Sequence, residues 1–327
     1  MAATVSTLSS EHRVLLEGCG LLDRSERGKL ALTGAGAREF LGGQVTNELA
    51  ALAPGEGRFA AFLTHKGKML GDLRVLAVGA DPDAAPAELL LDTERVALQN
   101  LFDMIRHFKV GFDVELHKRT LESAMLSLIG PQAGAIAAAE RLPEAEHAHL
   151  ASELTGVAVR AVRTDVGVDL IFDSAERDLL WSELCERGAV PVSDAAAECL
   201  RIESGRPRYG LDIDDSVIPQ EAGLNERAVS FTKGCYVGQE TVARLHYRGR
   251  PNRHLRGLLL SSPAASGEEL LLDERPVGRI GSCALSPRLG PIALALVRRE
   301  AHPGATVAVR EAGAPAEVVE LPFSGRG

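Results

Sequence analysis

Near Arg256 the pattern of the sequence changes, and the change separates two kinds of structure. After it, short apolar runs such as LRGLLLSS, IALALVRR and AEVVELPF are separated by Gly and Pro. Short apolar runs with turn residues between them are typical of a small antiparallel barrel. Before Arg256, strand-like segments alternate with helical patterns. The sequence therefore predicts an α+β fold that ends in a small antiparallel β-barrel.

Three upstream segments have patterns that predict their structure. RFAAFLTHKGKMLGDLRV is typical of two strands joined at HKGK, where Gly67 supplies the turn. Residues 94–111 predict a helix with one apolar face, and residues 174–188 predict another that ends at Gly188. The apolar face of the first helix consists of Leu98, Leu101, Phe102 and Ile105.

Charge and composition restrict the partners of the chain. It has 327 residues, of which 36 are Lys or Arg and 45 are Asp or Glu, so the net charge is −9. A negative field argues against direct nucleic-acid binding. No apolar run approaches the roughly 20 residues that span a bilayer, and the N-terminus lacks the pattern of a secretory signal. Five scattered cysteines indicate reduced thiols, so we expect a cytoplasmic protein without a membrane partner.

The stretch SFTKGCYVGQETVARLHYRGRPNR, residues 230–253, concentrates reactive side chains. Lys233 lies two residues before Cys235, and a positive neighbour lowers the pKa of a thiol and favours the reactive thiolate. Alternatively, Cys235 is a small residue buried in a tight turn. The sequence leaves both alternatives open.

The same stretch begins a run of arginines. Between residues 244 and 256 there are five arginines, two histidines and no acid. Such runs are often solvated surfaces. In an acidic protein, however, clustered guanidiniums favour a site for a carboxylate or phosphate, and we expect an anion to bind here. The arginines are Arg244, Arg248, Arg250, Arg253 and Arg256.

Two further segments contain candidate site residues. Glu203 lies in CLRIESGRPRYG, close to the predicted helix end at Gly205. A carboxylate there suits a ligand edge with adjacent N–H donors, although an exposed helix glutamate is the commoner outcome. Metal binding is not predicted, since Cys-x-x-Cys and His-x-x-x-His spacings do not occur. We expect His147 and His149, in an Ala/Glu-rich segment, to be solvated.

Beyond these patterns, the sequence resembles a known family over nearly its whole length. KGCYVGQETVARLHYRG closely resembles the signature of the folate-binding YgfZ family, and FLGGQVTNEL resembles its N-terminal hallmark. LRIESGRPRYGLDI is similar to the segment with the pterin-binding glutamate in the wider glycine-cleavage T-protein superfamily. PVGRIGSCALSPRLGPIALALV and the closing LPF resemble the C-terminal barrel of that superfamily.

The resemblance implies a three-lobed, T-protein-like folate-binding fold around a central funnel for tetrahydrofolate. The lobes would be residues 1–115, residues 116–250 with the KGCYVGQE motif, and the barrel, residues 251–327. The implied function is a folate-binding accessory protein that supports iron–sulfur cluster assembly or repair and, through it, tRNA modification. Its implied partners are iron–sulfur proteins or their assembly factors. The alternative is an enzyme, a tetrahydrofolate-dependent aminomethyltransferase.

The resemblance also implies roles for single residues. Glu203 would bind the pterin, and Cys235 would be the signature thiol. Asp72, in GKMLGDLRV, falls where T-proteins tend to show two successive acids, with Gly71 in the first place. This departure favours the accessory function and leaves open which position carries the chemistry. The thiol would be framed by Lys233, Gly234, Tyr236, Gly238, Gln239 and Glu240, and of these Lys233, Tyr236 and Gln239 would also bind the cofactor. Arg244, Arg248 and Arg250 would bind a polyglutamate tail of the folate.

Overall fold

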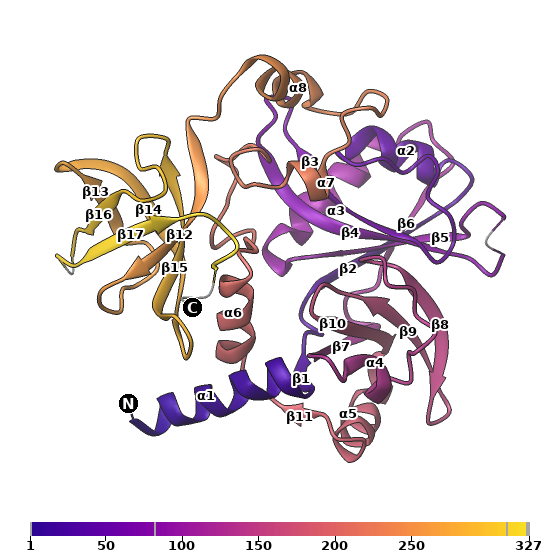
Figure 1. The fold of residues 1–327 in the computed structure, drawn as a ribbon. Coiled ribbons are helices and arrows are strands. Elements are labelled where there is room, and N and C mark those ends of the chain that lie inside the picture. Colours follow the sequence, from indigo (N-terminus) through magenta and orange to yellow (C-terminus); the bar gives the residue numbers. More distant parts are fainter. Residues whose placement is uncertain (1, 82, 312, 325–327) are drawn as a thin grey trace.

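The computed structural model describes residues 2–81, 83–311 and 313–324. These residues form three β-structures, which are connected and covered by helices (Figure 1). The first is a five-stranded antiparallel sheet in the order β3-β4-β5-β2-β6. Its strands are β2 (Gly28–Thr33), β3 (Gly57–Leu63), β4 (Met69–Val78), β5 (Glu88–Thr93) and β6 (Glu115–Lys118). The helices α2 (Ala37–Gln44) and α3 (Leu98–Phe108) belong to the same region of the chain.

The second β-structure is a six-stranded sheet in the order β11-β1-β7-β10-β9-β8. Its strands are β1 (Gly20–Asp23), β7 (Ser123–Ile129), β8 (His149–Leu154), β9 (Val157–Arg163), β10 (Gly167–Asp173) and β11 (Val190–Pro191). Helices α4 (Ala133–Ile136) and α5 (Arg177–Glu186) accompany it. Six apolar side chains from both sheets form a shared core, so the two sheets pack against each other.

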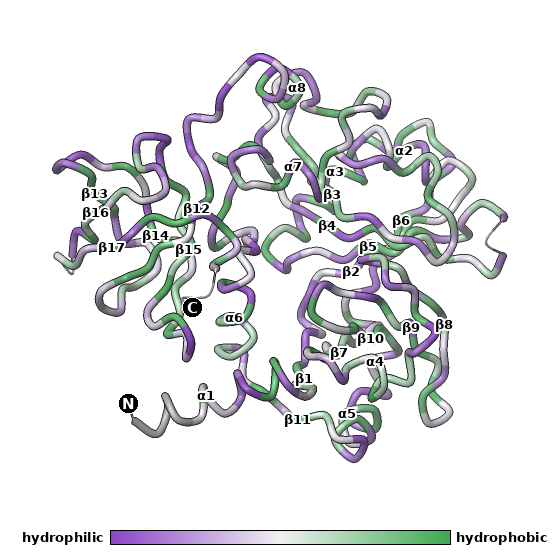
Figure 2. Tube along the Cα trace, viewed as in Figure 1, coloured by the Kyte–Doolittle hydropathy of each residue, from purple (hydrophilic) through white to green (hydrophobic). Residues whose placement is uncertain are grey.

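The third β-structure is a closed antiparallel barrel in the order β12-β15-β14-β13-β16-β17. It consists of β12 (Arg253–Leu260), β13 (Glu269–Leu272), β14 (Arg275–Ser286), β15 (Gly290–Arg298), β16 (Thr306–Val309) and β17 (Pro315–Val319). The predicted α+β class and C-terminal barrel are thus confirmed. In Figure 2 the strands are mostly hydrophobic, whereas the connection that leads into β12 is hydrophilic.

Four further helices connect these parts: α1 (Ala2–Glu17), α6 (Asp194–Glu203), α7 (Asn225–Ala228) and α8 (Gln239–Arg248). Helix α6 lies between the barrel and the second sheet and contacts α1, β14 and β15 (Figure 1). Within the described ranges, we find no helix that combines the length and the apolar composition needed to cross a membrane.

Two segments pack across the predicted lobe boundaries. Strand β1 comes early in the chain, yet Gly20 pairs with Ile129 in the second sheet. Conversely, residues between Tyr209 and Val242 join the hydrophobic core of the first sheet. The KGCYVGQE motif therefore packs with the first sheet, although the sequence analysis placed it in the second lobe. The boundaries themselves stay a prediction.

Candidate functional site

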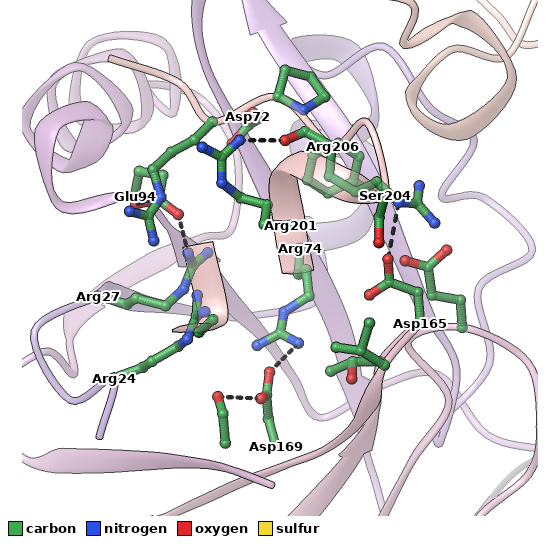
Figure 3. A pocket seen from close by; sticks show the side chains of 18 of the residues that line it. Arg24, Arg27, Asp72, Arg74, Glu94, Asp165, Asp169, Arg201, Ser204 and Arg206 are labelled. Atoms are coloured by element: carbon green, nitrogen blue, oxygen red, sulfur yellow. Dashed lines mark hydrogen bonds and ion pairs between the residues drawn. The ribbon is translucent and has the colours of Figure 1, made fainter. Parts of the chain in front are cut away.

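A polar pocket of about 210 Å³ is lined by both sheets, by α6 and by the segment that follows α6 (Figure 3). Its lining includes the aromatic rings of Phe59 and Tyr209, but charged side chains dominate it. Five carboxyl groups, Asp72, Glu94, Glu146, Asp165 and Asp169, face seven guanidiniums. The arginines are Arg24, Arg27, Arg74, Arg201, Arg206, Arg208 and Arg227.

A buried ion-pair network joins the two sheets at this pocket. On β4, Arg74 donates from Nε to Asp92 Oδ2 and from a terminal nitrogen to Asp169 Oδ2, both at 2.6 Å. Arg27 Nε donates to the other oxygen of Asp92, also at 2.6 Å. Burial alone would raise the pKa of Asp92, but the two guanidiniums outweigh it and lower that pKa to about 2. The network therefore stays charged at neutral pH.

Asp72 is the predicted site residue that lines this pocket. It lies two residues before Arg74 on β4, so both side chains point to the same face of the sheet. Asp72 is 6% exposed, and its carboxyl group has no hydrogen bond or ion pair with the described residues. Burial, followed by the negative charge of Glu94, raises the pKa of Asp72 to about 7. Near neutral pH this group can therefore both donate and accept a proton.

The structure also distinguishes Asp72 from its neighbour Gly71. A Cβ atom built on Gly71 would lie 2.6 Å from the Ala97 Cβ atom and 2.6 Å from the Phe62 ring. The backbone at Gly71 thus faces a packed core, and Asp72 faces the pocket. The sequence left open which position carries the chemistry, and the alternation along β4 favours Asp72.

The expectation that His147 and His149 are solvated is wrong. They are 8% and 3% exposed, because the segment before β8 folds back onto the two sheets. His147 lines the pocket, where burial and the charges of Arg74 and Arg227 lower its pKa to about 3. His147 is therefore neutral at pH 7. The local Ala/Glu-rich composition contained no signal for this burial.

The predicted frame of the thiol lies away from the pocket lining. Cys235 is exposed, whereas Tyr236 is buried in the core of the first sheet. Lys233 Nζ donates to the backbone carbonyls of Gly42, Val45 and Asn47 at 2.6, 2.7 and 2.8 Å. A cation at the C-terminal end of a helix satisfies carbonyls that lack an intrahelical partner. Lys233 therefore holds the end of α2, and burial lowers its pKa to about 8.

Two glycines bring the KGCYVGQE motif against the β3–β4 hairpin. Gly238 has φ 84°, and a Cβ atom there would lie 2.6 Å from the Thr64 carbonyl oxygen. Gly67, at the predicted turn, has φ 75°, and its Cβ atom would lie 2.9 Å from that of Thr241. Glycine suits both positions because of the positive φ and the close approach. The motif thus packs on the turn of the hairpin whose second strand carries Asp72.

The arginine run divides into two groups. Arg253 pairs with Glu221, and Arg256 pairs with Glu320, each at 3.0 Å. Arg244 and Arg248 on α8, and Arg250 after it, are exposed. Gln239 begins α8, and its side chain donates to the Gly234 carbonyl at 3.5 Å. Anion binding by the three exposed arginines stays a prediction.

Glu203 is not among the residues that line the pocket, and its carboxyl group contacts α1 and the end of β14 instead. Its Oε1 atom accepts a hydrogen bond from Ser286 Oγ at 2.5 Å and lies 3.1 Å from His12 Nε2. A contact with a pterin would require this side chain to leave both partners. Potential ligand atoms of His12, Cys199 and Glu203 lie within 4.8 Å of one another, a grouping that the sequence spacings did not indicate.

Comparison with known proteins agrees with this architecture. Residues 2–233 match the family described as GCVT N-terminal domain, and residues 253–324 match the glycine cleavage T-protein C-terminal barrel domain. The aminomethyltransferase of Synechococcus sp. (strain RCC307) is 31% identical over 349 residues, covering 100% of this chain and 93% of that protein. The aminomethyltransferase of Streptomyces avermitilis is 31% identical over 347 residues, covering 97% and 89%.

A solved structure gives the same result. The crystal structure of glycine cleavage system aminomethyltransferase T from Bartonella henselae superposes with a TM-score of 0.84 at 25% identity. The match covers 97% of this chain and 89% of that chain. The predicted accessory function in iron–sulfur cluster assembly and tRNA modification is therefore wrong, because these full-length relatives are named as aminomethyltransferases. The departure at Gly71 was given too much weight, since Asp72 still faces the pocket.

Proposed function

Because the chain belongs to the glycine cleavage T-protein family, we propose that it is a tetrahydrofolate-dependent aminomethyltransferase. The observation that carries the proposal is the unpaired carboxyl group of Asp72 in the central pocket. The four other carboxylates of the lining are paired with arginines, whereas Asp72 has no partner among the described residues and is free to meet a substrate. Full-length relatives named aminomethyltransferase support the same conclusion.

The lining of the pocket suits a reduced pterin. A pterin presents adjacent N–H donors and a carbonyl oxygen along one edge, and it offers flat faces to aromatic rings. Asp72 supplies an acceptor for the N–H groups. Phe59 and Tyr209 supply apolar surface. We propose that these groups orient tetrahydrofolate and that solvent is displaced from the pocket when it binds.

Asp72 would act in proton transfer. When an amine nitrogen of the folate forms a new bond to carbon, it loses a proton, and the amine that leaves the donor gains one. A carboxyl group with a pKa of about 7 is suited to carry such a proton at neutral pH. His147 is neutral and lies in the same pocket, so it adds no competing positive charge. Arg74 fixes the position of β4 through its ion pairs.

The test is an aminomethyl-transfer assay with purified protein, an aminomethyl-loaded lipoyl carrier protein and tetrahydrofolate. We expect ammonia release that depends on tetrahydrofolate. Asp72→Asn should lower kcat by about 10²- to 10⁴-fold, as general acid–base catalysis contributes that much. The matched control is Asp215→Asn, which removes an exposed carboxylate. Absence of tetrahydrofolate-dependent ammonia release with wild-type protein would contradict the proposal.

The KGCYVGQE motif resembles the YgfZ branch, and we propose that here it holds the hairpin that presents Asp72. Its contacts with the hairpin turn and with the end of α2 support this role. Cys235→Ser in the same assay tests whether the thiol of Cys235 takes part in catalysis, as the resemblance predicted. If the exposed thiol takes part in the transfer, kcat falls while the melting temperature is unchanged. If its role is not catalytic, kcat stays at the wild-type value.

We also propose that Arg244, Arg248 and Arg250 bind a polyglutamate tail, since all three are exposed without an acid between them in the sequence. Exposed ion pairs contribute only about 0.2–1 kcal/mol each and are screened by salt. Pentaglutamyl tetrahydrofolate should therefore bind more tightly than the monoglutamate at about 0.05 M salt and lose this advantage at about 0.5 M. Arg248→Ala/Arg250→Ala should remove the advantage at low salt. An advantage that survives both changes would refute this role.

A further inference from the structure

The arginines of the pocket are not equivalent. Six of the seven form an ion pair with a carboxylate. The seventh, Arg24, forms no side-chain hydrogen bond or ion pair with any residue in the described ranges. Arg24 is thus the guanidinium of this pocket whose charge is left without a direct partner.

The place of Arg24 makes the missing partner significant. It follows β1, and its backbone N–H donates to the Met125 carbonyl at 2.9 Å, which fixes the residue against the second sheet. Its Nε atom is buried and finds no acceptor. Burial lowers the pKa of Arg24, and the nearest acids, Asp169 and Glu94, compensate only in part. An unmatched charge in such a place destabilises the protein unless a ligand provides the counter-charge.

The nearby acids are already occupied. Asp169 accepts from Arg74 and from Ser127 Oγ, both at 2.6 Å. Glu94 pairs with Arg27 and with Arg208. Neither acid can turn to Arg24 without breaking another ion pair. The guanidinium of Arg24 therefore offers hydrogen-bond donors at the pocket, and no acceptor among the described residues pairs with them.

Asp72 provides the complementary group. Arg24 and Asp72 both line the pocket, and Arg27 and Glu94 are charged neighbours of both. In Figure 3, Arg24, Arg27 and Glu94 lie at the left of the pocket and Asp72 lies at its top. A ligand that satisfies both groups carries an anion at one end and N–H donors at the other. A planar carboxylate matches the arginine fork, with two parallel N–H donors facing two oxygens.

We propose that Arg24 binds the carboxylate of a ligand whose N–H group faces Asp72. The inference rests on the proposed function in one respect, that this pocket is the substrate site. The carboxylate comes either from the glutamate part of tetrahydrofolate or from a small amino acid that enters the same pocket. Both sources have the same chemistry at Arg24, and their binding can be separated by experiment.

The test measures binding by calorimetry with wild type, Arg24→Gln and Arg106→Gln, a charge-matched control at an exposed position of α3. The probes are tetrahydrofolate, 6-methyltetrahydropterin, glycine and glycinamide. Loss of a charge-assisted contact should weaken binding about 10- to 150-fold. If tetrahydrofolate loses affinity in Arg24→Gln and the tail-less pterin does not, the tail is the source. If glycine binds, glycinamide does not, and the difference disappears in Arg24→Gln, the source is a small amino acid.

Two outcomes overturn the inference. One is that Arg24→Gln binds every carboxylate probe as tightly as wild type. The other is that wild type shows no preference for a carboxylate over its uncharged counterpart. Arg24→Lys keeps the positive charge but lacks the planar fork, so it should lose part of the affinity. This conservative variant distinguishes a lost contact from a failure of Arg24→Gln to fold. Because binding is measured without turnover, a failed transfer assay leaves this result intact, and the two proposals fail separately.

Discussion

Asp72→Asn should change how the stability of the protein depends on pH. In an unfolded chain an aspartate has a pKa of about 3.9, whereas the pKa of Asp72 in the folded protein is about 7. Between these values the folded state keeps a proton that the unfolded state has released. The free energy of unfolding therefore falls as the pH rises from about 4 to about 7. Asparagine cannot titrate, so this loss disappears in the variant.

The magnitude follows from the two pKa values. Each pKa unit corresponds to about 1.36 kcal/mol. Summed over the range from pH 5 to pH 8, the difference in bound protons between the folded and unfolded states is equivalent to about two pKa units. Relative to wild type, Asp72→Asn should therefore gain about 2.5 kcal/mol in free energy of unfolding over this range. Asp72 is almost fully buried, so solvent screening does not reduce the effect.

The assay is urea unfolding of wild type and Asp72→Asn at pH 5, 6, 7 and 8, in one buffer system at constant ionic strength. The other titrating groups are common to both proteins and cancel in the difference. Asp215→Asn, which alters an exposed carboxylate, is the matched control. If the difference between Asp72→Asn and wild type is constant with pH, the carboxyl group of Asp72 is not held in its protonated form by the pocket, and the assignment as acid and base loses its basis.

Three substitutions test the structural roles assigned above. Gly238→Ala should lower the free energy of unfolding, measured in urea, by about 1–3 kcal/mol, because φ is positive and the new Cβ atom meets the Thr64 carbonyl. An unchanged midpoint of urea unfolding would contradict the close packing of the motif on the hairpin. Lys233→Met keeps most of the side-chain volume but leaves carbonyls at the end of α2 unsatisfied. It should therefore lower the free energy of unfolding, measured by heat or urea, by about 1–3 kcal/mol. A loss under about 0.5 kcal/mol would be evidence against the role of Lys233 in holding the end of α2. Arg74→Met leaves Asp92 and Asp169 without their shared partner, so it should lower the free energy of unfolding by about 3–5 kcal/mol at pH 7. The loss should be smaller at acid pH, where carboxylates are protonated. A loss independent of pH would contradict the ion-pair account.

The fold was largely predictable because local patterns specify it. The β3–β4 hairpin lies where the apolar runs on both sides of HKGK predicted it, and Gly67 has the required positive φ. On α3, Leu101 and Ile105 are fully buried, as the helical spacing indicated. The barrel follows from short runs with Gly and Pro between them. In each case the signal lies within about 20 residues and is read as the alternation or spacing of apolar side chains.

The site was less predictable, because its residues meet only through tertiary structure. Asp72 was found through a resemblance, and the strand alternation then explains its direction. Arg24 and Arg27 lie in the turn between β1 and β2, whereas Arg74 lies on β4, and nothing in this spacing indicates a common pocket. Lys233 was assigned to the cofactor from its place beside Cys235. Its amino group instead reaches the end of α2, nearly 190 residues earlier in the chain, a contact that no local pattern specifies.

The arginines of this acidic chain gather in two places, and only one of the two clusters is contiguous in the sequence. An acidic chain was expected to need an anion wherever arginines gather in sequence, which pointed to residues 244–256. In the structure the other cluster is assembled from separate segments at the pocket, and the protein supplies its own carboxylates for six of its seven arginines. Pairing of this kind fixes the two sheets to each other and keeps the pocket rigid and charged. It also makes the exceptions informative. Among the described residues of the lining, Arg24 and Asp72 are the charged groups without a partner, and they mark where a ligand completes the network.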